Sequence, residues 1–261
     1  MQSHSSSPMS DSPPSTSRRA DARAVFADAS AVFAALAFPT LLVWVYFVVL
    51  PEQEASPAIQ QTAYTLGKIL QFAFPLVWVL AIQRCRLAWK KPDTKGVTEG
   101  FLFGVAIFVA TLILYCAWLK PAGVLEVARE PIRLRLFGYG LTSLPMYVLF
   151  GVFIALAHSL LEEYYWRWFV FGELRRLVPF PVAIAVSGVG FMSHHVVVLS
   201  TYFGWWSLPA VLFSLAVAVG GAAWAWIYHR SGSLYGVWVS HLLVDVAIFV
   251  VGYDLVGGHL G

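Results

Sequence analysis

Charged side chains are scarce in this sequence: 12% of its 261 residues are Asp, Glu, Lys or Arg, whereas 59% are hydrophobic. Soluble domains carry roughly 25% charged residues, so this composition excludes an ordinary soluble domain. The net charge of +3 is small and dispersed, which gives no support to nucleic-acid binding. Segments of about ten residues with alternating polarity, the mark of a transmembrane β-barrel, are also lacking.

Cysteine is nearly absent as well. Cys85 lies in a basic segment and Cys116 lies inside an apolar run, so we expect the two thiols at different depths and predict no disulfide. Neither cysteine has a second Cys or a His at a spacing typical of a metal site.

Long apolar runs dominate instead, and the mean hydropathy is +0.72. Several runs approach the ~20 residues that span a bilayer as a helix. The sequence therefore predicts an all-α, polytopic transmembrane helical bundle. We place seven spans at 26–50, 62–82, 99–119, 143–170, 181–203, 208–229 and 233–253. The segment 120–142 carries several charges and is predicted as an amphipathic or re-entrant helix; if it crossed the bilayer, there would be eight spans.

Three regions are expected along the chain. Residues 1–23 are rich in Ser, Pro and charge and are predicted to form a disordered tail. Residues 24–142 are predicted to form the N-terminal transmembrane helices, and residues 143–261 are predicted to form the helical core. Basic residues precede the first predicted span and follow the second, fourth and sixth, which favours a cytoplasmic N-terminus under the positive-inside rule. The Ala, Val and Trp content and the compact length favour a bacterial inner (cytoplasmic) membrane.

Polar residues inside the predicted spans are the most informative feature. Six ionisable side chains lie in apolar stretches of the C-terminal core: Glu162, Glu163, Arg167, His195, His241 and Asp245. A charge near the bilayer centre costs on the order of 3 kcal/mol or more, so such residues normally face the bundle interior and mark functional sites. We therefore expect a catalytic cavity among the C-terminal helices.

Helical spacing groups the residues of the fourth span. Glu163 and Arg167 are four residues apart on one helix face, in the order that favours an ion pair. Glu162 points about 100° away from Glu163, so the two carboxylates need not share one cation. His158 lies one turn before Glu162 and is within reach of it.

The fifth and seventh spans carry the imidazoles. His194 and His195 also differ by about 100° in direction, so we expect only one of them to face Glu162. His241 and Asp245 are four residues apart, and a carboxylate one turn from an imidazole can fix its tautomer.

The ordered patterns Glu162-Glu163-x-x-x-Arg167, Phe191-x-x-x-His195 and His241-x-x-x-Asp245 resemble the three motifs of the CAAX-protease and bacteriocin-processing (CPBP) family of intramembrane glutamic endopeptidases. The resemblance covers about 150–253, and residues 1–120 contribute no motif to it.

The resemblance implies a role for each matched position. Glu162 is the general base that activates water, and His195 helps to hold that water. Glu163 and Arg167 form a structural pair, and His241 with residue 245 stabilises the oxyanion. The family often has Asn where this chain has Asp245, and an ionised carboxylate repels an oxyanion. Asp245 is therefore either protonated or orients His241, and we favour the second role. His158 and His194 are expected to be structural or supporting residues.

Other interpretations of the same residues stay open. Buried acids and histidines also serve proton-coupled transporters, although the paired repeats and broken helices of those proteins are not evident here. A non-catalytic immunity or scaffold protein of the same fold is a further alternative. Glu162, His195 and His241 match a His₂Glu zinc set in composition, but no His-Glu-x-x-His helix is present, so we expect no cofactor. The expected partners are a membrane-anchored protein or peptide substrate and membrane lipids; the oligomeric state is not indicated.

Overall fold

The structure of this chain, a computed structural model, describes residues 16–86 and 91–260. Within them, seven helical segments are long and apolar enough to cross a membrane. They run over Ala22–Glu52, Pro57–Ile82, Thr94–Leu119, Leu144–Leu177, Phe180–Phe203, Leu208–Ser231 and Leu234–Val256. The seven predicted spans are confirmed, with ends that agree to within seven residues.

Several spans combine α-helical and π-helical turns. The first comprises α1 (Thr16–Trp44), η1 (Val45–Val49) and α2 (Leu50–Glu52), and the second comprises α3 (Pro57–Val77) and η2 (Trp78–Ile82). The third comprises α4 (Thr94–Leu114) and η3 (Tyr115–Leu119). The fourth is built from α6 (Leu144–Phe153), η4 (Ile154–His158), α7 (Ser159–Glu163), η5 (Tyr164–Phe171) and α8 (Gly172–Leu177). The last three are single helices, α9 (Phe180–Phe203), α10 (Leu208–Ser231) and α11 (Leu234–Val256), and the short η6 (Gly257–His259) follows.

Polar caps set where these helices begin. Ser56, Asp93 and Ser207 each accept a hydrogen bond from a backbone N–H three residues further on, at 3.4, 3.1 and 3.2 Å. Such caps satisfy N–H groups that lack a partner within the helix. Gly232 adopts φ +62° between α10 and α11, a left-handed conformation that glycine takes at little cost.

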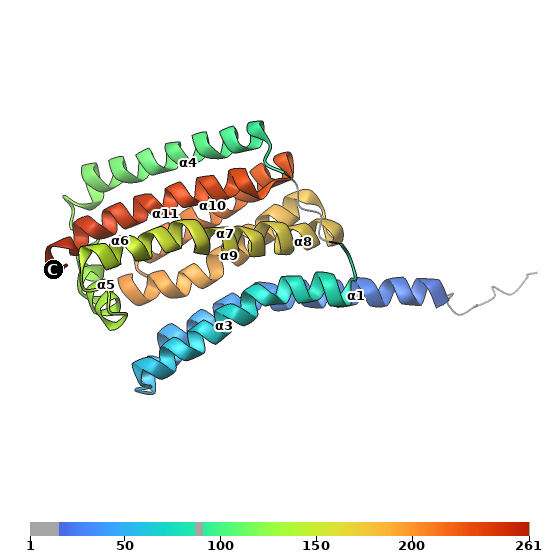
Figure 1. Ribbon diagram of the computed structural model, residues 1–261, viewed down its shortest axis with the longest axis horizontal. Coiled ribbons are helices and arrows are strands. Elements are labelled where there is room, and N and C mark those ends of the chain that lie inside the picture. Colours follow the sequence, from blue (N-terminus) through green and yellow to red (C-terminus); the bar gives the residue numbers. More distant parts are fainter. Residues whose placement is uncertain (1–15, 87–90, 261) are drawn as a thin grey trace, which may run out of the picture.

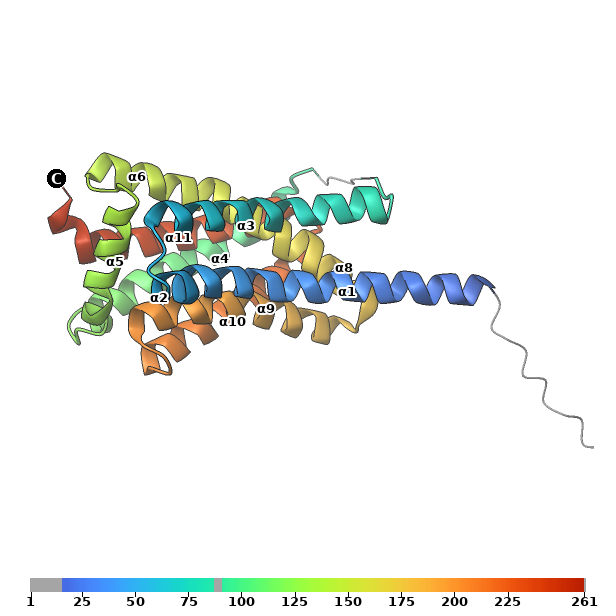
Figure 2. The same ribbon diagram turned by 90° about the horizontal axis from the view of Figure 1, so that it is seen from below.

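The charged segment after the third span does not cross. It forms α5 (Glu126–Gly138), whose 13 residues measure about 20 Å, less than the ~30 Å of a hydrocarbon core. Figure 2 shows α5 lying across the end of the bundle near the C-terminus. The helical prediction for 120–142 is thus confirmed.

The N-terminal helix starts earlier than predicted. α1 begins at Thr16, so residues 16–23, which were expected in the disordered tail, are helical. Arg and Ala, which dominate 18–24, are strong helix formers, and this local preference outweighed the polar composition. Residues 1–15 of the predicted tail lie outside the described residues.

The helices form a main bundle with an attached pair. Figure 1 shows α1 and α3 together along one side of the bundle that the remaining spans make. Two hydrogen bonds join the pair to the bundle at one end: Gln83 Nε2 donates to Asp28 Oδ1 and to Glu173 Oε2, both at 3.0 Å. Gln83 follows η2, Asp28 lies on α1 and Glu173 lies on α8, so these hydrogen bonds fix three helical segments relative to one another.

Small residues let α4 and α11 approach closely. Gly96, Gly100 and Gly104 repeat every four residues on one face of α4 and are all buried. A Cβ at Gly100 would overlap the backbone carbonyl of Gly236, and one at Gly104 would lie 2.8 Å from the Cα of Ser240. This contact of small residues is a common means of helix packing in membranes, and it holds α11 against α4.

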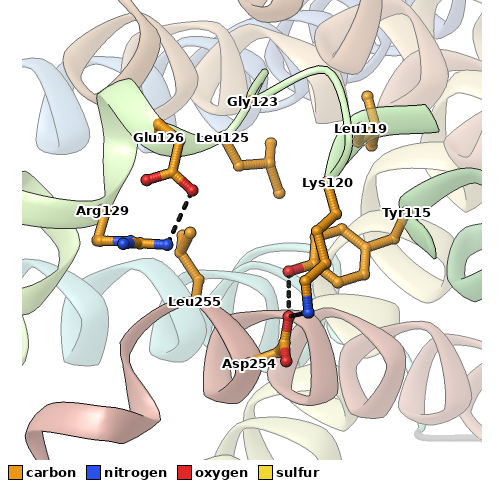
Figure 3. A pocket seen from close by; sticks show the side chains of 9 residues that line it. All are labelled: Tyr115, Leu119, Lys120, Gly123, Leu125, Glu126, Arg129, Asp254 and Leu255. Atoms are coloured by element: carbon orange, nitrogen blue, oxygen red, sulfur yellow. Dashed lines mark hydrogen bonds and ion pairs between the residues drawn. The ribbon is translucent and has the colours of Figure 1, made fainter. Parts of the chain in front are cut away.

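A polar clasp (Lys120, Tyr115 and Asp254) closes the other end of this contact. Lys120 Nζ and the Tyr115 hydroxyl both donate to Asp254 Oδ2, at 2.6 and 2.5 Å. Figure 3 shows the clasp beside a small pocket, with the Glu126–Arg129 ion pair at the opposite wall. The clasp therefore ties the end of η3 to the end of α11.

Candidate active site

Two adjacent glutamates occupy the fourth span where its helical geometry changes. Glu162 and Glu163 end α7, a single five-residue segment with π-helical turns on either side, η4 and η5. Both are buried, with 4% and 0% exposure. π-Helical turns inserted in α-helices occur frequently at functional sites. Here they flank the only two carboxylates in the middle of this described span.

Three imidazoles surround the Glu162 carboxylate. His158 Nε2 lies 3.9 Å and His194 Nε2 lies 3.7 Å from Glu162 Oε1. His241 Nε2 lies 3.8 Å from Glu162 Oε2. The three rings come from the end of η4, from α9 and from α11, so Glu162 is the point at which three spans converge.

Glu163 forms a fully buried ion pair, as its spacing to Arg167 predicted. Arg167 Nε lies 3.1 Å from Glu163 Oε2, and neither side chain is exposed. The guanidinium also lies over the rings of Phe191 and Trp224, at 4.6 and 5.1 Å from their centroids. These ring faces stabilise a cation that water does not reach.

Glu163 has a second partner that the sequence did not indicate. His241 Nδ1 lies 2.7 Å from Glu163 Oε1. Because a carboxylate accepts hydrogen bonds, His241 is the donor through Nδ1. The His241 ring stacks on Trp224, with centroids 4.3 Å apart, and Trp224 is itself held by a 2.9 Å hydrogen bond from its Nε1 to Ser240 Oγ. Glu163 and Trp224 together fix the orientation of the imidazole.

Asp245 lies beside the other nitrogen of the His241 ring. Its Oδ1 lies 3.7 Å from His241 Nε2, so the two are close but do not form a short hydrogen bond. Its Oδ2 is buried without a hydrogen-bond partner among the described residues. The nearest carboxylate to the His241 ring among the described residues is therefore that of Glu163, and Asp245 faces the other ring nitrogen.

The two neighbouring histidines of α9 are placed differently from the expectation. His194, expected to be a supporting residue, brings Nε2 to 3.7 Å from Glu162 and stacks on Trp166, with ring planes only 8° apart. His195 makes no ion-pair contact with Glu162 in the described part of the chain; its Nδ1 donates to the Phe191 carbonyl at 2.9 Å. The rotation of α9 is the cause, because its buried face runs through Phe191, His194 and Val197.

His195 nevertheless stays beside the cluster. Its ring centroid lies 4.2 Å from that of His194 and 4.8 Å from that of Phe191. With Nδ1 engaged as a donor to a carbonyl, the neutral ring presents Nε2 as a hydrogen-bond acceptor. His195 can thus accept a hydrogen bond from water or substrate.

The arrangement supplies the groups that a hydrolytic reaction needs. It offers a carboxylate, Glu162, that can take a proton, and a His241 nitrogen that can donate to a developing negative charge. In the described residues, no group of three or more His, Cys, Asp or Glu side chains has the arrangement of a metal site. An apolar groove of about 600 Å³ between α1 and α9 reaches Gly190 and Ser193, immediately before His194.

One family model matches the chain. Residues 144–247 match the family described as type II CAAX prenyl endopeptidase Rce1-like. The matched segment begins with α6 and ends within α11, so it contains every polar residue of the cluster. No curated protein and no solved structure matches this chain.

Proposed function

Because residues 144–247 match the family model of type II CAAX prenyl endopeptidases, we propose that this chain is an intramembrane endopeptidase. It hydrolyses a peptide bond in a membrane-associated protein or peptide. The observation that carries the proposal is the position of Glu162, a carboxylate in the middle of a membrane-spanning helix with three imidazoles at 3.7–3.9 Å.

In the proposed reaction, Glu162 acts as the general base. It removes a proton from a water molecule, whose oxygen attacks the carbonyl carbon of the scissile bond. His195 accepts a hydrogen bond from this water through Nε2, while His194 holds the Glu162 carboxylate in place. Glu162 then gives the proton to the leaving nitrogen, so that the carboxylate returns to its starting state.

His241 is the proposed donor to the oxyanion. Its Nδ1 is occupied by Glu163, and its Nε2 faces the carboxylates of Glu162 and Asp245 at 3.8 and 3.7 Å. Three carboxylates around one ring favour a doubly protonated imidazolium, which has an N–H to donate from Nε2. Asp245, with Oδ1 3.7 Å from His241 Nε2, is proposed to orient this nitrogen and not to bind the oxyanion itself. Arg167 Nε, 3.1 Å from Glu163 Oε2, holds the Glu163 carboxylate in position beside the ring.

The proposal extends to the setting of the enzyme. The substrate is a membrane-anchored protein or peptide, the reaction needs no metal, and the protein resides in a bacterial inner membrane with its N-terminus in the cytoplasm. The basic residues at the ends of the spans support this orientation.

The test is cleavage by the purified protein in liposomes. A library of lipid-tethered peptides is incubated with the wild type and with the variants Glu162→Gln, His195→Ala and His194→Ala, and products are identified by mass spectrometry. General-base catalysis contributes about 10²–10⁴ in rate, so Glu162→Gln should lower cleavage by at least about 100-fold. Glu99→Gln, an acid at the start of α4 that pairs with Arg230 at 3.2 Å, is the matched control and should keep full activity.

The outcome separates this function from the alternatives. Thermal unfolding in detergent shows whether each variant is folded. Cleavage by folded Glu162→Gln at the wild-type rate would refute the proposed mechanism. Proton uptake coupled to a solute, without peptide cleavage, would instead identify a transporter, and the absence of both activities would identify a scaffold protein.

A further inference from the structure

A lysine in the middle of the second span has no role in the reaction described above. Lys68 lies on α3, and its Nζ is 5.4 Å from the ring centroid of Phe72 and 5.6 Å from that of Tyr64. No ion pair within 4 Å joins this ammonium to a carboxylate in the part of the chain that the structure describes. By contrast, Arg167, another cation inside a membrane-spanning segment, has its Nε 3.1 Å from Glu163 Oε2.

A membrane-embedded ammonium without an anion is costly. Charged residues at this depth normally pair with one another or line a path for a ligand. Contacts with the faces of two aromatic rings recover only part of that cost. The position therefore calls for a negative charge that the described residues do not bring into contact with Lys68.

Lys68 lies near the level of the catalytic glutamate. It precedes Ile82, the end of its span, by 14 residues, and Glu162 precedes Leu177, the end of its own span, by 15 residues. The hydrogen bond from Gln83 to Glu173 ties these two helix ends together. Counted from these two bonded residues, Lys68 is 15 and Glu162 is 11 residues away, so at 1.5 Å per residue the two side chains differ by about 6 Å in depth.

Aromatic contacts connect Lys68 with the cluster. The Phe72 ring that lies under the ammonium packs edge-on against His158, with centroids 6.2 Å apart, and His158 Nε2 is 3.9 Å from Glu162. Lys68 thus borders the cluster on its α3 side without touching the carboxylate.

Glu162 itself does not serve as the missing partner, because three imidazoles already occupy its surroundings at 3.7–3.9 Å. We propose that Lys68 determines specificity by binding a carboxylate of the peptide substrate on the α3 side of Glu162. This inference rests on the proposed endopeptidase function. Because Lys68 and Glu162 are not in contact, the bound carboxylate belongs to a residue beyond the scissile bond.

A peptide offers two sources of such a carboxylate, its C-terminus and an Asp or Glu side chain. The experiment therefore uses a peptide that the wild type cleaves, in matched forms: C-terminal acid against C-terminal amide, and Glu against Gln at each position near the cleavage site. Cleavage is measured in liposomes as kcat/KM, with kcat and KM resolved.

We expect the wild type to favour the acid form at one of these positions by about tenfold or more. Lys68→Met should reduce that preference to less than about twofold, chiefly through a higher KM for the acid form. Lys68→Arg keeps the charge and should retain part of the preference. Lys95→Met, the same change at an exposed lysine of α4, should leave the preference intact.

Each result decides the inference. A preference that Lys68→Met removes supports it, and the affected pair of peptides identifies the C-terminus or the side chain as the source. Cleavage without any acid preference in the wild type overturns the inference but leaves the endopeptidase proposal standing. An equal loss for acid and amide forms in Lys68→Met assigns Lys68 to folding or to Glu162, and also overturns it. If the wild type cleaves no peptide, both proposals fail.

Discussion

The buried pair of Glu163 and Arg167 gives a prediction whose size follows from the structure. Both side chains have no exposed surface, and Arg167 has no other carboxylate within 4 Å among the described residues. Removing one partner of such a pair leaves an uncompensated charge and typically costs about 3–5 kcal/mol. In Arg167→Met, Glu163 still binds His241 at 2.7 Å, so the loss should lie near the lower end, about 3 kcal/mol.

The double variant Arg167→Met/Glu163→Gln should recover much of this loss. The neutral amide that replaces the carboxylate leaves no charge to compensate, and its oxygen still accepts the hydrogen bond from His241. We expect a cost of about 1 kcal/mol for the double variant, the net value of an ordinary hydrogen bond. The coupling energy of the two sites would then be about 2 kcal/mol or more, which lies within the range for residues in contact.

Equilibrium unfolding of the four proteins in mixed micelles, with a denaturing detergent as the variable, measures the coupling. The reasoning predicts that the double variant is more stable than Arg167→Met alone. Losses that simply add, with a coupling energy near zero, would refute it, because the two charges would then not depend on each other. Peptide cleavage should stay low in the double variant, since His241 loses the carboxylate that keeps it charged.

Three further outcomes are expected. Gly100→Ala should destabilise the protein by about 1–3 kcal/mol and lower cleavage by displacing His241. Gly220→Ala, where a Cβ meets no atom within 4 Å, should leave stability and cleavage unchanged. Thermal unfolding and kcat compare the two variants, and equal effects would contradict the close-contact argument. Metal chelators should not lower cleavage in liposomes, and a loss that added zinc restores would contradict the metal-free mechanism. Asp254→Asn should cost less than about 1 kcal/mol, because its partner Lys120 is 57% exposed, and a larger loss in unfolding would show that the clasp holds the bundle together.

The spans could be predicted from the sequence because the bilayer imposes one requirement on every crossing segment. About 20 apolar residues in a row are needed, and all seven runs of that kind became spanning helices. The start of α1 at Thr16 was missed because tail composition was given more weight than the helix propensity of residues 18–24.

The site could be predicted in part. Spacing along one helix gave the Glu163–Arg167 pair, since residues four apart share a face whatever surrounds them. The contact of Glu163 with His241 joins two spans, and intervals within single helices contain no information on it. Likewise, one sequence does not fix the rotation of α9, which decides that His194 rather than His195 lies nearest to Glu162.

The glycines of α4 carry a signal that the spacing of the polar residues does not. Gly96, Gly100 and Gly104 recur at the interval typical of close helix contacts in membranes, and Gly236 lies at the corresponding position of α11. This interval marks the face of the third span that packs closely against another helix, and the structure identifies α11 as that helix.

That glycine contact has a consequence for how the protein tolerates change. His241 follows Gly236 by five residues on a continuous helix, so the depth of the imidazole is set where two bare backbones meet. No flexible side chain lies between them to absorb an error. A saturation mutagenesis survey should therefore reveal a second group of positions that tolerate no substitution, the glycines of α4. These residues have no reactive atom and act only by setting the position of His241.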